Sequence, residues 1–228
     1  MLLYLTIFYA GACCASFLSV CAWRLPQGRS IVAPRSQCDN CHQQLAWFDL
    51  LPLISYLILQ GKCRTCGKWI NFYFWGSEFS GGLLACFCWS HSWSLATIYL
   101  LVLLFEMSLV DLFHRILYPI PMLIAMAPLF YHYWSQNYWL SACLTGIIFC
   151  AFANWSAGFG LGDAELISIL TLWLGFEAIL QVLLVACLSC LLLYGIRRTL
   201  SKPCNYQIPF IPYILAGVVM LLGHGICP

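Results

Sequence analysis

Two pairs of cysteines have the spacing of a metal site. The pairs are Cys38-Asp39-Asn40-Cys41 and Cys63-Arg64-Thr65-Cys66, and 21 residues separate them. In a structural zinc site each such pair forms a tight turn, and four thiolates close a tetrahedron that leaves no position for water. We therefore predict a structural Zn²⁺ held by Cys38, Cys41, Cys63 and Cys66. A redox role is the alternative, although no thioredoxin-like alternation of strands and helices surrounds either pair.

Acidic residues inside or beside apolar stretches are the second group that could do chemistry, because charged groups are costly in lipid and usually functional there. Asp111 ends one apolar stretch, and Asp163 follows the glycine-rich run from Gly158 to Gly162. Two aspartates at one depth could form a proteolytic pair, in which one takes a proton from water and the other donates a proton to the peptide carbonyl. The alternatives are an ordinary helix end for Asp111 and a helix N-cap for Asp163.

The remaining ionisable residues of the apolar regions have simpler interpretations. Glu106 precedes Asp111 by five residues and could tune the aspartate pair or bind a basic partner. His114 with Arg115 is typical of a cytosolic boundary. Glu78 and Glu177 could be interface residues.

Composition identifies the solvent of most of this chain as lipid. Of 228 residues, 63% are hydrophobic and 8% are charged, against about 25% charged in soluble domains. The net charge of +2 and the lack of interleaved basic and aromatic residues argue against a nucleic-acid partner. We predict an all-α integral membrane protein whose main partner is the bilayer.

A helix that crosses a bilayer needs about 20 apolar residues, and this rule predicts about eight spans. No basic region precedes the first apolar run, so we expect a retained span and not a cleaved signal. Residues 24–71 interrupt the series and contain an apolar stretch, Leu50 to Leu59, that is too short to cross. We expect three domains: a first span (1–23), a cytosolic zinc loop (24–71) and a membrane domain (72–228). The predicted spans are residues 2–22, 72–90, 95–113, 117–134, 138–156, 164–176, 178–196 and 208–225.

The basic residues predict the orientation, since Lys and Arg accumulate on the cytosolic side of membranes. Alternating the spans from the zinc loop places every basic residue on the same side as that loop. The N-terminus is then outside, and Asp111 and Asp163 are both at the cytosolic face. The basic residues are Arg24, Arg29, Arg35, Lys62, Arg64 and Lys68 in the loop, and Arg115, Arg197, Arg198 and Lys202 beyond it.

With these motifs in place, the sequence resembles the type IV prepilin peptidase family over nearly its whole length. Asp111 with Pro119 and Gly160-Leu161-Gly162-Asp163 are similar to the family's D...P and GxGD motifs, which carry its two catalytic aspartates. Ile120 and Glu165 depart from the residues that many members have there. Other matching segments are Ala15-Ser16-Phe17-Leu18-Ser19-Val20, Arg24-Leu25-Pro26, Pro34 to Cys38 with Cys41, Asp49 to Tyr56, Gly61 to Gly67, Glu78 and Ile208 to Tyr213.

The resemblance implies an enzyme of the bacterial cytoplasmic membrane. Its substrates would be prepilin-like proteins of pili, secretion or competence, whose short basic leader is cut after a Gly at the cytosolic face. Many members also methylate the new N-terminus with S-adenosylmethionine, and they are the members associated with the cytosolic loop. For this sequence methylation is implied by the resemblance alone, because no glycine-rich nucleotide-binding pattern accompanies it.

Three other functions remain open from the sequence. A presenilin-type protease shares GxGD but would cut inside the membrane span of its substrate. A transporter would be expected to show paired inverted repeats of broken helices, and none is visible. A non-enzymatic scaffold of a secretion or DNA-uptake machine would use the zinc loop for docking and would tolerate loss of both aspartates.

Overall fold

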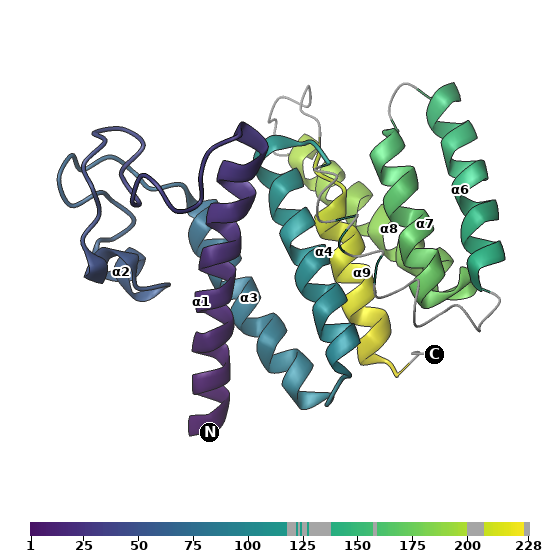
Figure 1. The fold of residues 1–228 in the computed structure, drawn as a ribbon, viewed down its shortest axis with the longest axis horizontal. Coiled ribbons are helices and arrows are strands. Elements are labelled where there is room, and N and C mark those ends of the chain that lie inside the picture. The colour runs from purple at the N-terminus through teal and green to yellow at the C-terminus, as the bar shows by residue number, and fades with distance from the viewer. Residues whose placement is uncertain are drawn as a thin grey trace. The chain divides into compact units, whose positions relative to one another are not determined.

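The chain is helical, as the sequence predicts. The computed structural model describes residues 1–117, 122, 124, 127, 138–156, 159–199 and 208–225. Within these residues the regular elements are helices, and extended pairing is limited to isolated bridges. The chain divides into two compact units, Met1–Ile98 and Tyr99–Pro228 (Figure 1). The all-α class is confirmed, whereas the division at residues 24 and 72 stays a prediction.

The first unit consists of two long helices and the cysteine-bearing loop between them. Leu25 and Pro26 end α1 in a short 3-10 turn. The side chain of Asn71 begins α3 by accepting a hydrogen bond from the amide of Tyr73. The elements are α1 (Leu2–Arg24), η1 (Leu25–Gln27), η2 (Trp47–Leu50), α2 (Ile54–Ile58) and α3 (Phe72–Ser90).

Small residues allow α1 and α3 to pack backbone against backbone. A Cβ built on Gly81 would collide with the Cβ of Ala15, and one built on Gly11 would collide with that of Ala85. Gly11 and Ala15 are four residues apart on α1, and Gly81 and Ala85 are four residues apart on α3. This spacing of small residues brings membrane helices close. A buried hydrogen bond of 2.7 Å between the hydroxyls of Ser19 and Ser77 also joins the helices.

The second unit is built around α7. Eight of its residues are buried, among them Ile167, Leu170 and Trp173. Gly175, at φ +81° and ψ 167°, separates α7 from α8, because this backbone conformation, which glycine adopts readily, ends one helix directly before the next begins. The elements are α4 (Leu95–His114), whose start up to Ile98 belongs to the first unit, α6 (Tyr138–Trp155), α7 (Leu161–Leu174), α8 (Phe176–Thr199) and α9 (Ile211–Gly223).

Helices lie at each predicted span that the structure describes, whereas the predicted span 117–134 lies almost wholly outside the described residues. Four described segments are long and apolar enough to cross a membrane, and the shorter α9 is also apolar. These segments support a multi-pass membrane protein, and the number of crossings stays a prediction. They are Leu2–Gln27, Leu95–His114, Tyr138–Trp155 and Phe176–Ile196.

Candidate functional site

The two cysteine pairs form matching turns in the loop of the first unit. The amide of Cys38 donates to the carbonyl of Gln43, and the amide of His42 donates back to Cys38, at 3.0 and 2.9 Å. Cys63 makes the same two bonds with Lys68 and Gly67, both at 2.9 Å. Each turn therefore presents its two thiols in the same way, although the two sequences share little beyond the cysteines.

The four sulfur atoms converge as a metal site requires. They lie within 4.8 Å of one another, and the Sγ atoms of Cys38 and Cys66 are 3.8 Å apart. Four sulfurs about 2.3 Å from one tetrahedral ion would lie about 3.8 Å from each other. The prediction that Cys38, Cys41, Cys63 and Cys66 come together is confirmed, and this cluster can hold a metal ion.

The surroundings of these sulfurs act on their charge in opposite directions. The amide of Lys68 donates to Cys66 and lowers the pKa of this thiol to about 6. The side chain of Asn40 also donates to the Cys66 sulfur at 3.6 Å and accepts from the Lys68 ammonium at 2.7 Å. In Cys41 the amide of Gln43 acts in the same direction, but desolvation and the neighbouring thiols raise the pKa to about 11. A bound dication would relieve this competition, because every thiolate would then face a positive charge.

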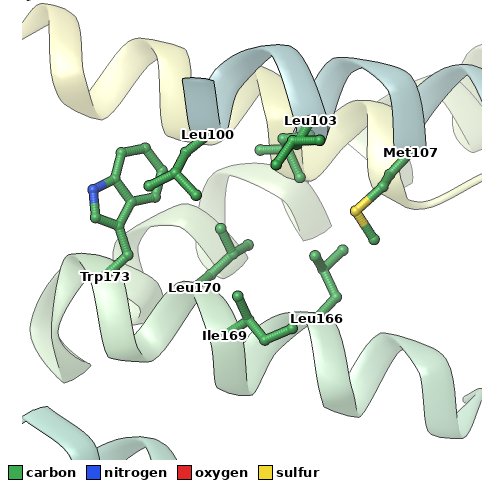
Figure 2. A pocket seen from close by; sticks show the side chains of 8 residues that line it. Leu100, Leu103, Met107, Leu166, Ile169, Leu170 and Trp173 are labelled. Atoms are coloured by element: carbon green, nitrogen blue, oxygen red, sulfur yellow. The ribbon is translucent and has the colours of Figure 1, made fainter. Parts of the chain in front are cut away.

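In the second unit α4 and α7 run side by side in opposite directions. Leu100 of α4 faces Trp173 and Leu170 of α7, and Met107 of α4 faces Leu166 (Figure 2). A narrow apolar cavity of about 20 Å³ lies between them. Asp111 is four residues beyond Met107, and Asp163 is three residues before Leu166. The antiparallel pairing therefore brings both aspartates to the same end of the two helices.

Asp111 lies in the last turn of α4 and contacts the start of α9. Its Oδ2 accepts a hydrogen bond of 3.0 Å from the amide of Ile211, the first residue of α9, and the amide of Phe210 also donates to it. Amides at a helix start are unpaired in the helix itself and carry its positive dipole end. The start of α9 thus holds and stabilises the half-buried carboxylate of Asp111.

Asp163 has the same relation to its own helix. It lies in the first turn of α7, and its carboxylate accepts a hydrogen bond from the amide of Gly160, the N-cap residue. The alternative in which Asp163 is the N-cap is wrong, because Gly160 is the N-cap and Asp163 reaches back to it from the first turn of the helix. Next to it, a Cβ built on Gly162 would lie 2.5 Å from Cδ1 of Leu117. The chain just beyond α4 therefore lies directly against the GxGD segment.

The two aspartates share one electrostatic environment. Both are half-buried, and the charge of Asp163 acts on the carboxylate of Asp111, as does the opposite charge of Arg115. Two carboxyl groups that bind one water molecule share a proton, because ionising both costs mutual repulsion in addition to desolvation.

Apart from Glu78, the other acids singled out from the sequence are half-buried or exposed. Glu106 is half-buried in α4 and accepts no hydrogen bond in the part of the chain that the structure describes. Glu165 and Glu177 are exposed.

The amide of Arg115 donates to the carbonyl of Asp111, at the end of α4. Pro119, the partner of Asp111 in the D...P motif, lies outside the described residues.

Glu78 connects three elements of the first unit. Its Oε1 accepts a hydrogen bond of 2.8 Å from the hydroxyl of Ser16 in α1, and its Oε2 accepts one of 2.7 Å from the amide of Leu53 in the loop. It is therefore an anchor for the loop, a role that goes beyond the interface residue expected.

Sequence reasoning missed the groups that hold the aspartates. Asp111 and its donor Ile211 are 100 positions apart in the chain, and a backbone amide has no residue type that could reveal it. The close approach of Leu117 could have been suspected from Gly162, because a glycine beside a functional residue often marks a place where another segment comes close to the backbone.

Comparisons with known proteins agree with the division into two units. Residues 9–92 match the family described as the bacterial peptidase A24 N-terminal domain, and residues 98–195 match the type IV leader peptidase family. In the sequence, the change from one match to the other lies close to the division between the two compact units, which follows Ile98. No solved structure matches the chain.

Curated relatives are similar over most of the chain. A protein of Escherichia coli named "Type 4 prepilin-like proteins leader peptide-processing enzyme" is 30% identical, covering 91% of this chain and 88% of its own length. A "Prepilin leader peptidase/N-methyltransferase" of Myxococcus xanthus is 33% identical over 79% of this chain, which spans 58% of that relative. One of the same name from Bacillus subtilis is 29% identical over 96% of this chain and 93% of its own.

Proposed function

Since the chain belongs to the type IV leader peptidase family, we propose that it is a membrane aspartic endopeptidase in which Asp111 and Asp163 are the catalytic pair. The observation that carries this proposal is the shared environment of the two carboxylates. They come from segments 52 positions apart, lie at one end of the α4 and α7 pair, and interact through their charges.

The chemistry follows from one proton shared by two acids. The ionised carboxylate removes a proton from a water molecule as this water attacks the peptide carbonyl carbon. The protonated carboxyl donates to the carbonyl oxygen, so that the tetrahedral intermediate is neutral. The carboxyl that now holds the proton gives it to the leaving nitrogen as the C–N bond breaks, and the other carboxylate takes a proton from a hydroxyl of the intermediate, which becomes the new carboxyl group. The pair is again left with one shared proton. Because the acids titrate as a pair, we assign no fixed role to either one.

The helix starts at this site support the reaction in two ways. The amides of Ile211 and Gly160 fix the direction of the two carboxylates. Fixed donors also stabilise the negative charge that the pair carries, without reorganisation during the reaction. Asp111 accepts from an amide at the start of α9, and Asp163 accepts from an amide at the start of its own helix. These donors are therefore already in place when an attacking water binds between the two carboxylates.

We propose that the substrates are prepilin-like proteins with a short basic leader followed by a hydrophobic helix. The printed names of the relatives support this substrate class for those proteins. We further propose that the cut is made at the cytosolic face of the bacterial cytoplasmic membrane. The basic residues of the loop support this orientation, and alternate crossings from the loop return Asp111 at the end of α4 to the same side.

For the cysteine cluster we propose Zn²⁺ in a structural role. Four cysteine sulfurs at tetrahedral spacing suit this ion and leave no site for a reacting water. Its contribution is to fold a loop whose regular elements are the short η2 and α2.

N-methylation of the new N-terminus is a second proposal, supported by the names of the Myxococcus xanthus and Bacillus subtilis relatives. We assign no residues to S-adenosylmethionine. If methylation occurs, a processed substrate carries the added mass of one methyl group on its first residue.

The experiment is co-expression of a prepilin with the wild type and with Asp111→Asn and Asp163→Asn, followed by mass analysis of the substrate. We expect full-length prepilin with each variant at normal enzyme abundance, and normal processing with the matched control Glu165→Gln, an exposed acid two positions from Asp163. Retained cleavage in either aspartate variant would reject the peptidase proposal and favour a scaffold. A product whose N-terminus lies inside the hydrophobic helix would indicate the presenilin type.

A further inference from the structure

The apolar stretch of the loop, residues 50–59, is too short to cross a membrane and yet is not buried in the protein. It forms the end of η2, a tight turn and α2. Leu57 and Ile58 are 64% and 70% exposed, and Ile54 is also exposed. Trp47 and Trp69, on either side of the stretch in sequence, are 72% and 70% exposed. In water such side chains would form a costly surface.

Glu78 determines the depth of this stretch. The carboxylate binds the amide of Leu53 and the hydroxyl of Ser16. Ser16 lies eight residues before Arg24, the end of α1, which corresponds to about 12 Å along the helix. Glu78 lies six residues after Phe72, the start of α3, or about 9 Å. The turn at Leu53 is therefore well below the Arg24 end of α1 and the Phe72 end of α3. In Figure 1 α2 is drawn at the level of α1, below the end of α1 that leads into the loop.

The length of α1, compared with the thickness of the bilayer, indicates where in the bilayer the turn at Leu53 lies. Its 23 residues are about 34 Å long, against about 30 Å for the hydrocarbon core. Even with the whole excess on the side of Arg24, Ser16 would remain about 8 Å inside the core. A loop segment tied to this level meets lipid and not bulk water.

The backbone of the stretch is suited to that environment. The amide of Leu53 donates to Glu78. Lipid offers no hydrogen-bond partners, so irregular backbone at that depth must satisfy its polar groups internally. The following amides do so with local carbonyls: Ile54 to Pro52, Ser55 to Leu51, Leu57 to Leu53, Leu59 to Ser55, Gln60 to Leu57 and Gly61 to Tyr56.

The turn itself is one that a side-chain-bearing residue rarely adopts. Leu53 has φ 62° and ψ −48°, and the amide of Ile54 reaches the carbonyl of Pro52 at 2.6 Å across it. This tight γ-turn is strained for a residue with a Cβ. The bond from the amide of Leu53 to Glu78 holds the strained turn in place.

We propose that residues 50–59 are a membrane-inserted segment, with Ile54, Leu57 and Ile58 among the acyl chains just below the lipid headgroups. Trp47 and Trp69 lie at the headgroup level, where indole rings are favoured. The ammonium of Lys62 lies 4.7 Å from the centre of the Trp69 ring, which places a cation beside that headgroup layer. The occupant of this exposed surface is therefore bilayer lipid, in continuity with the lipid around α1.

The proposal goes beyond the proposed peptidase function and does not depend on it. It assigns to the zinc loop a second attachment to the membrane, through its own apolar segment, in addition to the two helices that flank it. The metal cluster would then be held near the membrane surface.

The test is photo-cross-linking of the full chain, metal included, reconstituted in lipid nanodiscs. A benzophenone amino acid replaces Leu57 in one variant and Ile58 in a second, so that one failure to fold does not end the test. Gln43, an exposed polar position of the same loop, is the matched control. Bound metal and protein yield are measured for each variant as folding checks.

We expect lipid adducts, identified by mass, several-fold more abundant from positions 57 and 58 than from position 43. Glu78→Leu in the position 57 variant removes the anchor and should lower its lipid adduct several-fold. Equal lipid yields from positions 57 and 43 would overturn the proposal. It would also be overturned if the main product joined two copies of the chain, since the surface would then be a contact between copies.

Discussion

Gly162→Ala is expected to damage catalysis far more than Gly160→Ala, although both glycines belong to the same GxGD motif. A Cβ at position 162 would lie 2.5 Å from Cδ1 and 2.9 Å from Cβ of Leu117. At position 160 the nearest atom to a new Cβ is Oδ2 of Asp163, at the ordinary contact distance of 3.5 Å. The first substitution must move something, and the second need not.

The size of the effect follows from this overlap. The contact with Cδ1 is about 0.9 Å short of an ordinary separation of 3.4 Å. Rotation of Leu117 cannot relieve the contact with its Cβ, so the backbone of one of the two segments must shift. A shift of the start of α7 carries Asp163 with it. A displacement near 1 Å at a reacting group costs on the order of 100-fold in rate. Overpacking should also lower the free energy of unfolding by about 1–3 kcal/mol.

The assay is cleavage of a purified prepilin by each variant reconstituted in lipid, with kcat and KM measured separately. Gly162→Ala should lower kcat more than it raises KM, because the dyad is displaced and not the surface that binds the substrate helix. Gly195→Ala is the packing control, since a Cβ there meets nothing within 4 Å. Leu117→Gly in the Gly162→Ala background should recover part of the lost rate.

Two outcomes would refute this reasoning. If Gly162→Ala retained normal kcat, then the contact with Leu117 would not position Asp163. If Gly160→Ala lost as much activity as Gly162→Ala, then the motif would depend on backbone freedom at both positions and not on the close approach of one.

Two further predictions concern the first unit. Cys63→Ser should abolish stoichiometric Zn²⁺, measured by elemental analysis of the purified protein, whereas Cys187→Ser, at an exposed helical position, should not; a folded wild type without metal would contradict the assignment. Gly81→Leu should separate α1 from α3 because no space exists beside Ala15, which should lower thermal stability measured in detergent by on the order of several °C, while Gly76→Leu, whose new Cβ meets only Phe72 at 3.9 Å, should leave it nearly unchanged.

The cysteine cluster could be predicted from sequence because its geometry is local. Each pair lies on one short turn, so the spacing alone nearly determines where its sulfurs point. Helix positions were predictable for a similar reason, since the apolar length is a property of each segment by itself. The start of α7 was less predictable. The length of the apolar stretch predicts that this helix begins after Asp163. In the structure Gly160 is its N-cap, and Asp163 lies in its first turn.

The contacts that connect distant segments could not be predicted in the same way. Ser16 and Leu53 meet at Glu78, and Asp111 meets the amide of Ile211, only because of how helices pack. The spacing of Gly11 and Ala15 and of Gly81 and Ala85 did carry a signal for close helix packing. It did not identify the partner helix, and the pairing of α1 with α3 supplies that information.

The most direct test of the central claim compares the two aspartate variants with the double variant in a single-turnover cleavage assay. If Asp111 and Asp163 act as one unit around a shared proton, then Asp111→Asn, Asp163→Asn and the double variant should lose the same amount of rate. If the losses of the single variants add in the double variant, or if either single variant still cleaves at a substantial rate, then the two acids act independently and the account of a shared catalytic pair is wrong.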